Sequence, residues 1–412
     1  MKIGIVGAGI IGTLTAYEFA RRGHHVKVFD REPATAMRCS KANGAQISVC
    51  NSHTWNTWAN VLKGLKWMTK KDAPFLIRPS FDVAKMKWLA GFLRHTMNGS
   101  HLSNTIATIE LGKASSARYD EIIVEEGLQF DQSKCGLLHV YTNTKSLDQA
   151  LEQQDLFEDH GVEWKPIERD GIIKLDPALE TFKDLKGGIL TSTDWTGDAH
   201  LFCEALRKTV ERKFDARFFF NSTVSSRIRT NQVSGRHALL WEQYRENSKR
   251  TFGQLEGGFD HIIICNGHEI VNFARQVRDD LNVFPVKGYS ITIDGVDEQA
   301  PRVSLLDDEK KIVCARLGNR LRVAGTAELD GTDDSIREDR IRPLVRWVNE
   351  NFPGISTAHR EEWACLRPMN SNMMPIVRES SLPGVWYHGG HGHLGWTLGA
   401  GTTDALVKFI LK

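Results

Sequence analysis

The chain opens on Ile3-Gly-Ile-Val-Gly-Ala-Gly-Ile-Ile-Gly12, in which Gly7, Gly9 and Gly12 follow a short apolar run with the spacing G-x-G-x-x-G. This pattern predicts a buried strand, a tight turn and the first turn of a helix. The first glycine permits the turn, the second lets the backbone approach a pyrophosphate, and the third lets the helix pack closely on the strand. Free N–H groups at the helix start would bind the phosphates. The stretch therefore predicts a dinucleotide site on a Rossmann-like fold.

The residues that follow complete a β-α-β unit. A second apolar run over 26–28 ends before Asp30, whose carboxylate is placed to accept hydrogen bonds from a ribose hydroxyl. A glycine triplet alone would be a weak signal, but the full order of strand, turn, helix, strand and acid favours a bound dinucleotide over a purely structural turn. Ile10, Ile11 and Arg31 flank these positions and belong to the predicted cofactor site.

Length and composition are those of an ordinary globular protein. With 412 residues the chain is long for one core, so we expect two domains. The net charge of +2 gives no field that would attract nucleic acid. The seven cysteines show neither a C-x-x-C pair nor metal-ligand spacing, which indicates reduced thiols. Because the first strand starts beside Met1 and no apolar run could span a bilayer, we expect no signal peptide and a cytoplasmic location.

Two further glycine turns favour FAD over NAD. An apolar strand over 260–265 ends at Asn266 and Gly267, and a glycine-rich stretch over 389–395 precedes a helix predicted over 396–411. Three segments would then converge on one sheet edge, whereas NAD folds usually need only the first. A helix that starts beside a flavin ring would also stabilise its anionic reduced form. The alternative is a merely flexible loop over 389–395, but its four glycines and two histidines directly before a helix favour the cofactor role.

Apolar periodicity predicts the remaining elements. Helices are expected over 111–126, 149–159, 200–214 and 341–352, and strands over 136–141, 187–193, 218–225, 284–293, 311–316 and 320–324. Residues 31–52 predict an ordered ligand-contacting loop. The predicted fold class is α/β, or α+β overall, with a Rossmann-like FAD-binding domain interleaved with a substrate domain on a mainly antiparallel sheet. The FAD-binding domain is expected over 1–60, 101–130, 197–280 and 358–412, and the substrate-binding domain over 61–100, 131–196 and 281–357.

Residues 61–100 form a basic, tryptophan-rich helical insert. Between Lys63 and Arg94 lie eight basic and two acidic side chains, a net charge of +6. Met86, Leu89, Ala90 and Leu93 recur at helical spacing, with Trp88 and Phe92 beside them and Lys85, Lys87 and Arg94 at the rim. Such a helix suits a membrane interface, which predicts peripheral contact through 61–97 on the inner face of the cell membrane. The alternative, and the commoner origin of this pattern, is a helix packed on its own domain with a solvated lysine face.

Blocks along nearly the whole chain resemble one family. They are Asp30-Arg-Glu-Pro33, Ser40-Lys-Ala-Asn-Gly-Ala-Gln-Ile-Ser48, Leu65-Lys-Trp-Met68, Thr196-Gly-Asp198, Pro285-Val-Lys-Gly-Tyr-Ser290, Arg322-Val-Ala-Gly325, Leu366-Arg-Pro-Met369, Gly390-His-Gly392 and Leu394-Gly-Trp-Thr397. The chain resembles the D-amino acid dehydrogenase family, of the kind that forms a small subunit, within the D-amino acid oxidase and glycine oxidase group of FAD flavoproteins. The resemblance implies oxidation of a D-amino acid to an imino acid, which hydrolyses to a 2-oxo acid and ammonia. It also implies hydride transfer from the α-carbon to flavin N5, with the electrons passed to a quinone or another acceptor.

The resemblance assigns site residues as well. Arg367 matches the Leu-Arg-Pro position, where a guanidinium can bind the substrate carboxylate bidentately. Tyr289 is the second candidate, as a hydrogen-bond donor to the carboxylate or a roof over the ring, and its alternative is a packed aromatic. The cofactor positions, for a non-covalently bound FAD, are Ser40, Asn43, Gly44, Gln46, Ile47, Val224, Asn266, Gly267, Gly390, His391, Gly392, His393, Leu394, Gly395, Trp396 and Thr397.

Two departures from the family pattern leave the substrate open. His393 stands where the family has Thr, beside the expected flavin and substrate, so it is the third candidate catalytic residue. Its alternative is a histidine that caps a neighbouring loop. Asn370-Ser-Asn-Met373 replaces the family's Thr-Pro-Asp-Gly. An alternative function is therefore an oxidase or dehydrogenase of a secondary amine such as D-hydroxyproline, sarcosine or another N-substituted glycine. A further alternative is an electron-carrying flavoprotein subunit of a larger complex.

Overall fold

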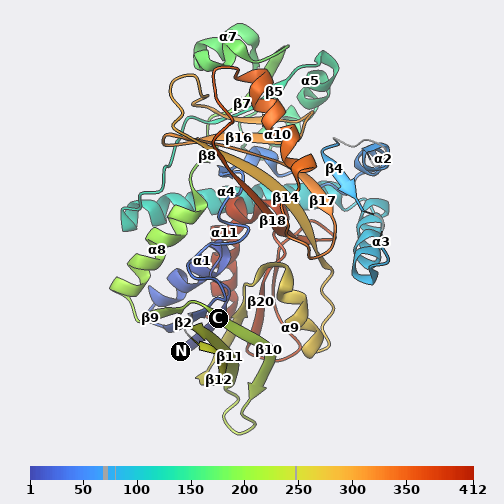
Figure 1. The fold of residues 1–412 in the computed structure, drawn as a ribbon. Helices are drawn as coiled ribbons and strands as arrows, with labels where there is room; N and C mark the ends of the chain where they lie inside the picture. The colour runs from blue at the N-terminus through green and yellow to red at the C-terminus, as the bar shows by residue number, and fades with distance from the viewer. Residues whose placement is uncertain (68–72, 79, 246–247) are drawn as a thin grey trace.

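The computed structural model describes residues 1–67, 73–78, 80–245 and 248–412. Two large sheets organise the molecule, one in the lower half and one in the upper half of the view in Figure 1. The chain passes between them repeatedly, because strands from distant parts of the sequence alternate between the two sheets. Among the described residues, none of the helices combines the length and apolarity needed to cross a membrane.

The six-stranded sheet carries the glycine turn. Its order is β19 (Ile376–Glu379), β20 (Val385–Gly389), β13 (His261–Ile264), β1 (Lys2–Val6), β2 (His25–Phe29) and β9 (Ala216–Phe219). All neighbours pair in parallel except β19 and β20. Because β1 lies between β13 and β2, the residues that follow these three strands meet at one sheet edge. That edge receives Gly7, Asp30 and Asn266.

Both faces of the six-stranded sheet are covered. On one face, α1 (Ile10–Ala20), α4 (His101–Glu126), α8 (Ala199–Lys213) and α11 (Gly395–Ile410) share an apolar cluster with β1 and β2. On the other face, α9 (Ile270–Gln276) packs with a three-stranded sheet of β10 (Ser222–Thr230), β11 (His237–Arg245) and β12 (Ser248–Phe259). Burial on both faces explains why β13 has isoleucine at three successive positions.

The second sheet has nine strands. Its order is β18 (Arg360–Asn370), β14 (Val283–Asp294), β17 (Arg320–Leu329), β16 (Ile312–Leu317), β15 (Ser304–Asp307), β5 (Leu137–Tyr141), β7 (Gly187–Thr191) and β6 (Lys165–Glu168), with β4 (Phe75–Ile77) paired to β17. The pairing is antiparallel except at β15–β5 and β17–β4. One face packs on α10 (Glu338–Asn351) and α7 (Arg169–Leu175), and α3 (Val83–Met97) packs against β14, β17 and β18.

Short elements connect these layers. They are α2 (Trp58–Trp67), α5 (Thr144–Leu151), α6 (Gln154–Glu158), the strands β3 (Gln46–Ile47) and β8 (Trp195–Thr196), which pair with each other, and the 3-10 turns η1 (Val49–Asn51), η2 (Pro177–Thr181), η3 (Gly267–Glu269) and η4 (Gly392–Leu394). In Figure 1, α2, α3 and β4 lie together on one flank of the nine-stranded sheet. This flank is most of the tryptophan-rich insert.

The expected fold class is confirmed, and several element boundaries differ from expectation. The strand expected over 218–225 is two strands in different sheets, because Asn221 adopts a left-handed φ of 52° between β9 and β10. The helix expected over 149–159 is the pair α5 and α6. The helix expected from 111 begins at His101, and the loop over 31–52 contains β3 and η1.

One expected domain boundary also differs from the strand pairing. Residues from 358 onward are expected in the FAD-binding domain, but β18 pairs with β14 along its whole length, from Arg360 to Asn370. β18 therefore belongs to the nine-stranded sheet. Periodicity could not show this, because a strand's own sequence does not identify its partner.

Candidate functional site

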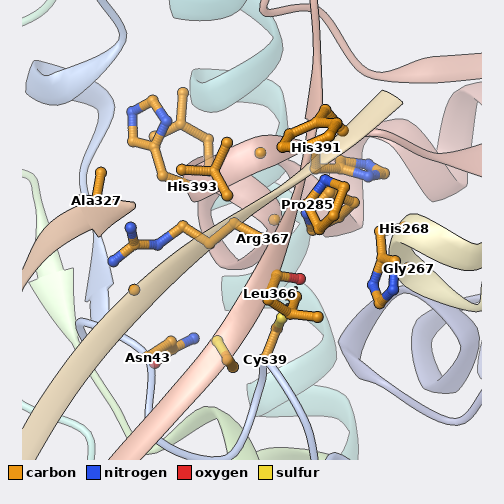
Figure 2. Close-up of a pocket in the computed structure, with 18 of the residues that line it drawn as sticks. Cys39, Asn43, Gly267, His268, Pro285, Ala327, Leu366, Arg367, His391 and His393 are labelled. Atoms are coloured by element: carbon orange, nitrogen blue, oxygen red, sulfur yellow. Dashed lines mark hydrogen bonds between the residues drawn. The ribbon is translucent and has the colours of Figure 1, made fainter. Parts of the chain in front are cut away.

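A cavity of about 2360 Å³ lies between the two sheets, and residues of both line it. This volume exceeds the roughly 300–1,000 Å³ of ordinary small-molecule sites, so it has room for a dinucleotide and a substrate together. Figure 2 shows residues from distant parts of the chain converging on it, among them Cys39, His268, Arg367 and His393.

The glycine turn meets one end of the cavity. Gly7 has a φ of 103°, and a Cβ there would lie 2.6 Å from the carbonyl oxygen of Cys265, so only glycine fits. A Cβ on Gly12 would lie 1.8 Å from the carbonyl oxygen of Gly7. Gly9 precedes α1, and the cavity reaches Gly9, Ile10 and Ile11. The helix start is therefore bare backbone that faces the cavity, as a phosphate site requires.

Asp30 holds the glycine turn from the end of β2. Its carboxylate accepts hydrogen bonds from the backbone N–H of Ala8, at 2.5 Å, and of Glu32, at 2.8 Å. Burial raises the pKa of Asp30, while these two N–H groups act in the opposite direction. Asp30 also lines the cavity, so a ribose hydroxyl could share its remaining lone pairs.

The loop after β2 runs along the cavity wall. Ser40 Oγ accepts a hydrogen bond from Ile10 N at 3.2 Å, which ties the loop to the start of α1. Asn43 Oδ1 accepts from Ala45 N at 2.9 Å, and the buried Gln46 amide donates to Leu305 O at 3.0 Å. These contacts anchor the loop to both sheets, since Gln46 reaches β15.

The C-terminal glycine turn follows β20, which lies parallel to β13, so it lines the cavity from the same edge of the six-stranded sheet. Gly390 and Gly392 have φ of 71° and 60°, and His391 between them is buried. His391 Nε2 lies 2.9 Å from Thr402 Oγ1, whereas its Nδ1 has no hydrogen-bond partner among the described residues. Burial lowers the pKa of His391 to about 3, so the ring is neutral at pH 7. A neutral imidazole with one unused nitrogen can donate or accept one hydrogen bond to a ligand.

His393 projects from the same turn beside Trp55. The two rings stack with centroids 4.6 Å apart at 25°. Neither ring nitrogen of His393 finds a hydrogen-bond partner within the part of the chain that the structure describes. Burial, aided by the Arg367 and Lys311 cations, lowers the pKa of His393 to about 3. Two buried nitrogens without a hydrogen-bond partner lower the stability of the folded state unless a ligand forms hydrogen bonds with them.

Arg367 crosses β14 from β18. A Cβ on Gly288 would lie 2.2 Å from the Arg367 guanidinium, so the guanidinium occupies the space that a side chain at 288 would need. Opposite Gly288, the β14–β17 register shifts between Lys287 and Tyr289, which marks a bulge in β17. Figure 2 shows the Arg367 side chain extended from its strand, with Ala327 of the bulge nearby in the view.

Thr326 lies in that bulge with a left-handed φ of 58°, a strained conformation for a β-branched residue. Its carbonyl accepts a hydrogen bond from Arg367 Nη1 at 3.1 Å. The other guanidinium N–H groups of Arg367 have no protein acceptor among the described residues, and Arg367 lines the cavity. A planar cation with free donors in a cavity can bind a carboxylate bidentately.

Tyr289 is placed differently from Arg367. Its side chain is buried and belongs to the core beneath the nine-stranded sheet, and its hydroxyl donates to Glu328 Oε2 at 2.6 Å. Burial and the Glu328 carboxylate raise the pKa of Tyr289. The residue still lines the cavity, so its predicted substrate contact stays a prediction.

Most predicted cofactor residues line this one cavity. The lining residues are Gly7, Gly9, Ile10, Ile11, Asp30, Arg31, Ser40, Asn43, Gly44, Gln46, Val224, Asn266, Gly267, His391, Gly392, His393, Leu394, Gly395 and Trp396. Four predicted residues are not among the lining residues of the cavity: Gly12, Ile47, Gly390 and Thr397. Two of these four residues have structural contacts instead. Ile47 is fully buried in the core, and Thr397 Oγ1 accepts a hydrogen bond from Ser48 N at 3.2 Å. The residues present fit a flavin dinucleotide, since the glycine backbone at Gly7, Gly9 and Gly267 lines the same cavity as His391, whose buried Nδ1 has no partner among the described residues.

Sequence reasoning missed three residues of the site. A glycine inside a strand pattern can indicate close backbone approach, which is an available signal for Gly288. Trp55 and Thr326 have no such signal, because the first depends on stacking with a residue far along the chain and the second on a backbone angle.

Comparisons with known proteins agree with this geometry. A family model described as FAD dependent oxidoreductase matches residues 2–408. D-amino acid dehydrogenase 3 of Mesorhizobium japonicum is 40% identical, with 99% of this chain and 97% of the relative covered, and D-amino acid dehydrogenase of Cereibacter sphaeroides is 33% identical, with 100% and 92% covered. Among solved structures, glycine oxidase from Bacillus cereus has a TM-score of 0.74 at 15% identity, covering 100% of this chain and 94% of that one. Iminodiacetate oxidase from Chelativorans sp. has a TM-score of 0.67 at 20% identity, with 99% and 95% covered.

Proposed function

Since the chain belongs to the FAD dependent oxidoreductase family and, within it, to the D-amino acid dehydrogenases, we propose that it oxidises a D-amino acid to an imino acid. The imino acid then hydrolyses to the 2-oxo acid and ammonia. The observation that carries the substrate class is Arg367, a cation whose other donors have no acceptor among the described residues and which lines the same cavity as His391 and His393. The six-stranded sheet with its helices would be the FAD-binding domain, and the nine-stranded sheet the substrate-binding domain.

FAD would lie along the edge of the six-stranded sheet. The glycine turn and the start of α1 would bind its pyrophosphate, Asp30 its ribose, and the loop from Ser40 to Gln46 together with the turn at His391 would enclose the ring. When bound, FAD supplies a two-electron acceptor whose N5 takes the hydride from the substrate α-carbon.

The substrate's carboxylate would bind to Arg367. Two guanidinium N–H groups can donate to the two carboxylate oxygens, which fixes the α-carbon while Thr326 O holds the third side of the guanidinium. His393 would hydrogen-bond the amine or a polar side chain, because it lines the cavity and its neutral ring has no hydrogen-bond partner among the described residues. Tyr289, whose hydroxyl donates to Glu328 Oε2, stays the second candidate for a contact with the substrate carboxylate or the ring.

An anaerobic titration tests the reaction class. The yellow holoprotein is mixed with D-amino acids, their L forms and N-substituted glycines, and loss of the flavin absorption band is followed. Bleaching by D-amino acids alone supports the proposal. Bleaching only by N-substituted glycines would instead support the secondary-amine function, and peroxide formation in air without an added acceptor would indicate an oxidase. If flavin is present and nothing bleaches it, copurification of a second chain would support the alternative of an electron-carrying part of a larger complex.

We further propose that the electrons pass to a quinone at a membrane, which the insert contacts. The structure corrects part of the expected pattern, because Trp88 is buried, with its indole N–H donating to Met369 O at 2.8 Å, and Lys85 is buried rather than at the rim. The outward face is nevertheless apolar. Its exposed side chains are Trp58, Leu62 and Leu65 on α2, Phe81, and Val83, Met86, Leu93 and Met97 on α3. Lys70 and Lys71, two of the lysines in the charge of the insert, lie outside the described residues.

Apolar side chains next to exposed Lys63 and Arg94 suit an anionic lipid surface. The occupant we propose is therefore the headgroup region of an anionic membrane. Cosedimentation with phosphatidylcholine vesicles, with and without phosphatidylglycerol, tests this. Binding should need the anionic lipid, and the double variant Phe81→Ser/Met86→Ser should bind at least about tenfold more weakly, because burying one large apolar side chain is worth about 1.5–3 kcal/mol.

Val233→Ser is the matched control for the membrane contact, since Val233 is equally exposed but lies between β10 and β11, away from the insert. Equal binding by wild type and the double variant, or equal binding to neutral vesicles, would refute the proposed contact.

A further inference from the structure

Two thiols meet at the cavity wall from different parts of the fold. Cys39 lies in the loop after β2, and Cys365 lies on β18. The Cys39 thiol donates to the carbonyl oxygen of Leu366 at 2.8 Å, so Cys39 lies against β18 at the residue next to Cys365. Figure 2 shows Cys39 and Leu366 side by side. Both thiols are free, half-buried and in contact with the cavity, and the proposed oxidation uses neither.

The surroundings of the pair favour thiol chemistry. The neighbouring Cys39 thiol lowers the pKa of Cys365, and the cations of Arg367 and Arg38 act in the same direction. The Cys365 thiol in turn raises the pKa of Cys39, and burial acts in the same direction. One thiol with a lowered pKa thus lines the cavity next to the residue that holds a second thiol, the arrangement of a reactive and a resolving cysteine.

We propose that Cys39 and Cys365 are a hydroperoxide-oxidation site that closes to a reversible disulfide. The Cys365 thiolate attacks one peroxide oxygen, the O–O bond breaks, and Cys365 becomes a sulfenic acid. The other peroxide oxygen takes up the proton that the Cys365 thiol has lost and leaves as water or as an alcohol. Cys39 sulfur then attacks the Cys365 sulfur, so that an S–S bond forms and the S–O bond breaks. The proton of Cys39 leaves with the hydroxyl as water. In total two thiols are oxidised and one hydroperoxide is reduced, to two waters when it is hydrogen peroxide.

The disulfide would act on the substrate site through β18. Cys365 and Arg367 are two residues apart on one strand, so their side chains project from the same face, and Cys365 pairs with Gly288, beneath the guanidinium. At the other end of the link, Ser40 follows Cys39 and holds Ile10 N at the start of α1. A covalent bond would fix the loop against β18 beside the carboxylate anchor. We expect weaker substrate binding with flavin retained, an effect on activity that rests on the proposed function.

Peptide mapping tests the bond itself without any assay of activity. The native holoprotein is treated with hydrogen peroxide, alkylated and digested without reductant, and linked peptides are identified by mass spectrometry. We expect a peptide pair joined through Cys39 and Cys365, a loss of two titratable thiols, and full reversal by dithiothreitol. Cys39→Ser and Cys365→Ser should each lack the linked pair. Cys135→Ser is the control, because Cys135 is exposed and should not affect the link.

Oxidation of Cys135 with no Cys39–Cys365 link, or over-oxidation of Cys365 with Cys39 still reduced, would overturn the proposed site. The activity measurement compares each protein with its own untreated sample. Wild type and Cys135→Ser should lose most substrate turnover on oxidation and regain it with dithiothreitol, while Cys39→Ser should show no loss that dithiothreitol reverses. A linked peptide with unchanged turnover would refute the coupling to Arg367. A protein that oxidises no D-amino acid would contradict the proposed function and leave the peptide result standing.

Discussion

Arg367 is the residue on which the proposed substrate class depends most. Replacement by Leu should raise the KM for the D-amino acid by at least about tenfold while flavin stays bound, because a lost charge-assisted hydrogen bond costs about 1.5–3 kcal/mol. Steady-state kinetics and the flavin absorbance of the purified variant measure the two effects. Arg302→Leu is the control, since Arg302 is exposed and, among the described residues, forms no ion pair besides a loose one with Glu298 at 3.7 Å. Ordinary KM values in the Arg367 variant would show that another group binds the carboxylate.

We expect His393 to determine which substrate side chains the enzyme prefers. The change His393→Thr removes the ring that stacks on Trp55 and leaves space, so larger D-amino acids should gain at least about tenfold in kcat/KM relative to D-alanine. A panel of D-amino acids measures this ratio. The exposed His359→Thr serves for comparison. An unchanged preference would mean that His393 has a structural role only.

The three strands β14, β17 and β18 position Arg367 together. Gly288→Ala should mimic Arg367→Leu, because its Cβ would displace the guanidinium, which would lie 2.2 Å away. We expect a similarly raised KM, retained flavin and an unfolding midpoint close to that of the wild type. Gly253→Ala is the matched sheet glycine, since its nearest neighbour would be 3.9 Å away. A Gly288→Ala variant with normal KM would contradict the placement of Arg367 over that position.

The same elements show where sequence reasoning succeeds and where it ends. The β1-turn-α1 unit could be predicted because the glycine requirement is local: a Cβ on Gly12 would meet the backbone of Gly7, and a Cβ on Gly7 would meet the backbone that follows the neighbouring strand β13. The close approach of the Arg367 guanidinium to Gly288 could not be predicted in this way, because it depends on a bulge in the pairing of two strands that are separated in the sequence. Trp88 shows the same limit. The helical spacing of the apolar residues around Trp88 is compatible with either a membrane-facing or a core-facing side chain, and only the hydrogen bond of Trp88 to Met369 on β18 shows that this side chain faces the core.

At the scale of the whole molecule, neutral buried histidines link stability to pH. Burial lowers the pKa of His391 and His393 to about 3 and of His53 to about 4, against about 6.5 in the unfolded chain. Above pH 6.5 these histidines are neutral in both the folded and the unfolded chain, so they do not lower the free energy of unfolding. Between pH 6.5 and the native values only the unfolded chain binds these protons, so stability is lost as the pH falls.

For His391 the loss should be about 2 kcal/mol between pH 7.5 and pH 5, from 1.36 kcal/mol per pH unit below the unfolded pKa. Urea unfolding of the holoprotein at both pH values, with FAD in excess, measures it for the wild type and for His391→Gln. The variant cannot titrate at this position, so its stability should fall by about 2 kcal/mol less than that of the wild type. If His391→Gln does not fold, the ring proton shifts of the wild-type histidines provide the test, because His391 should remain neutral at pH 5. Equal pH dependence of the two proteins, or a His391 ring that titrates near pH 6.5, would mean that the ring is accessible to protons in the native state.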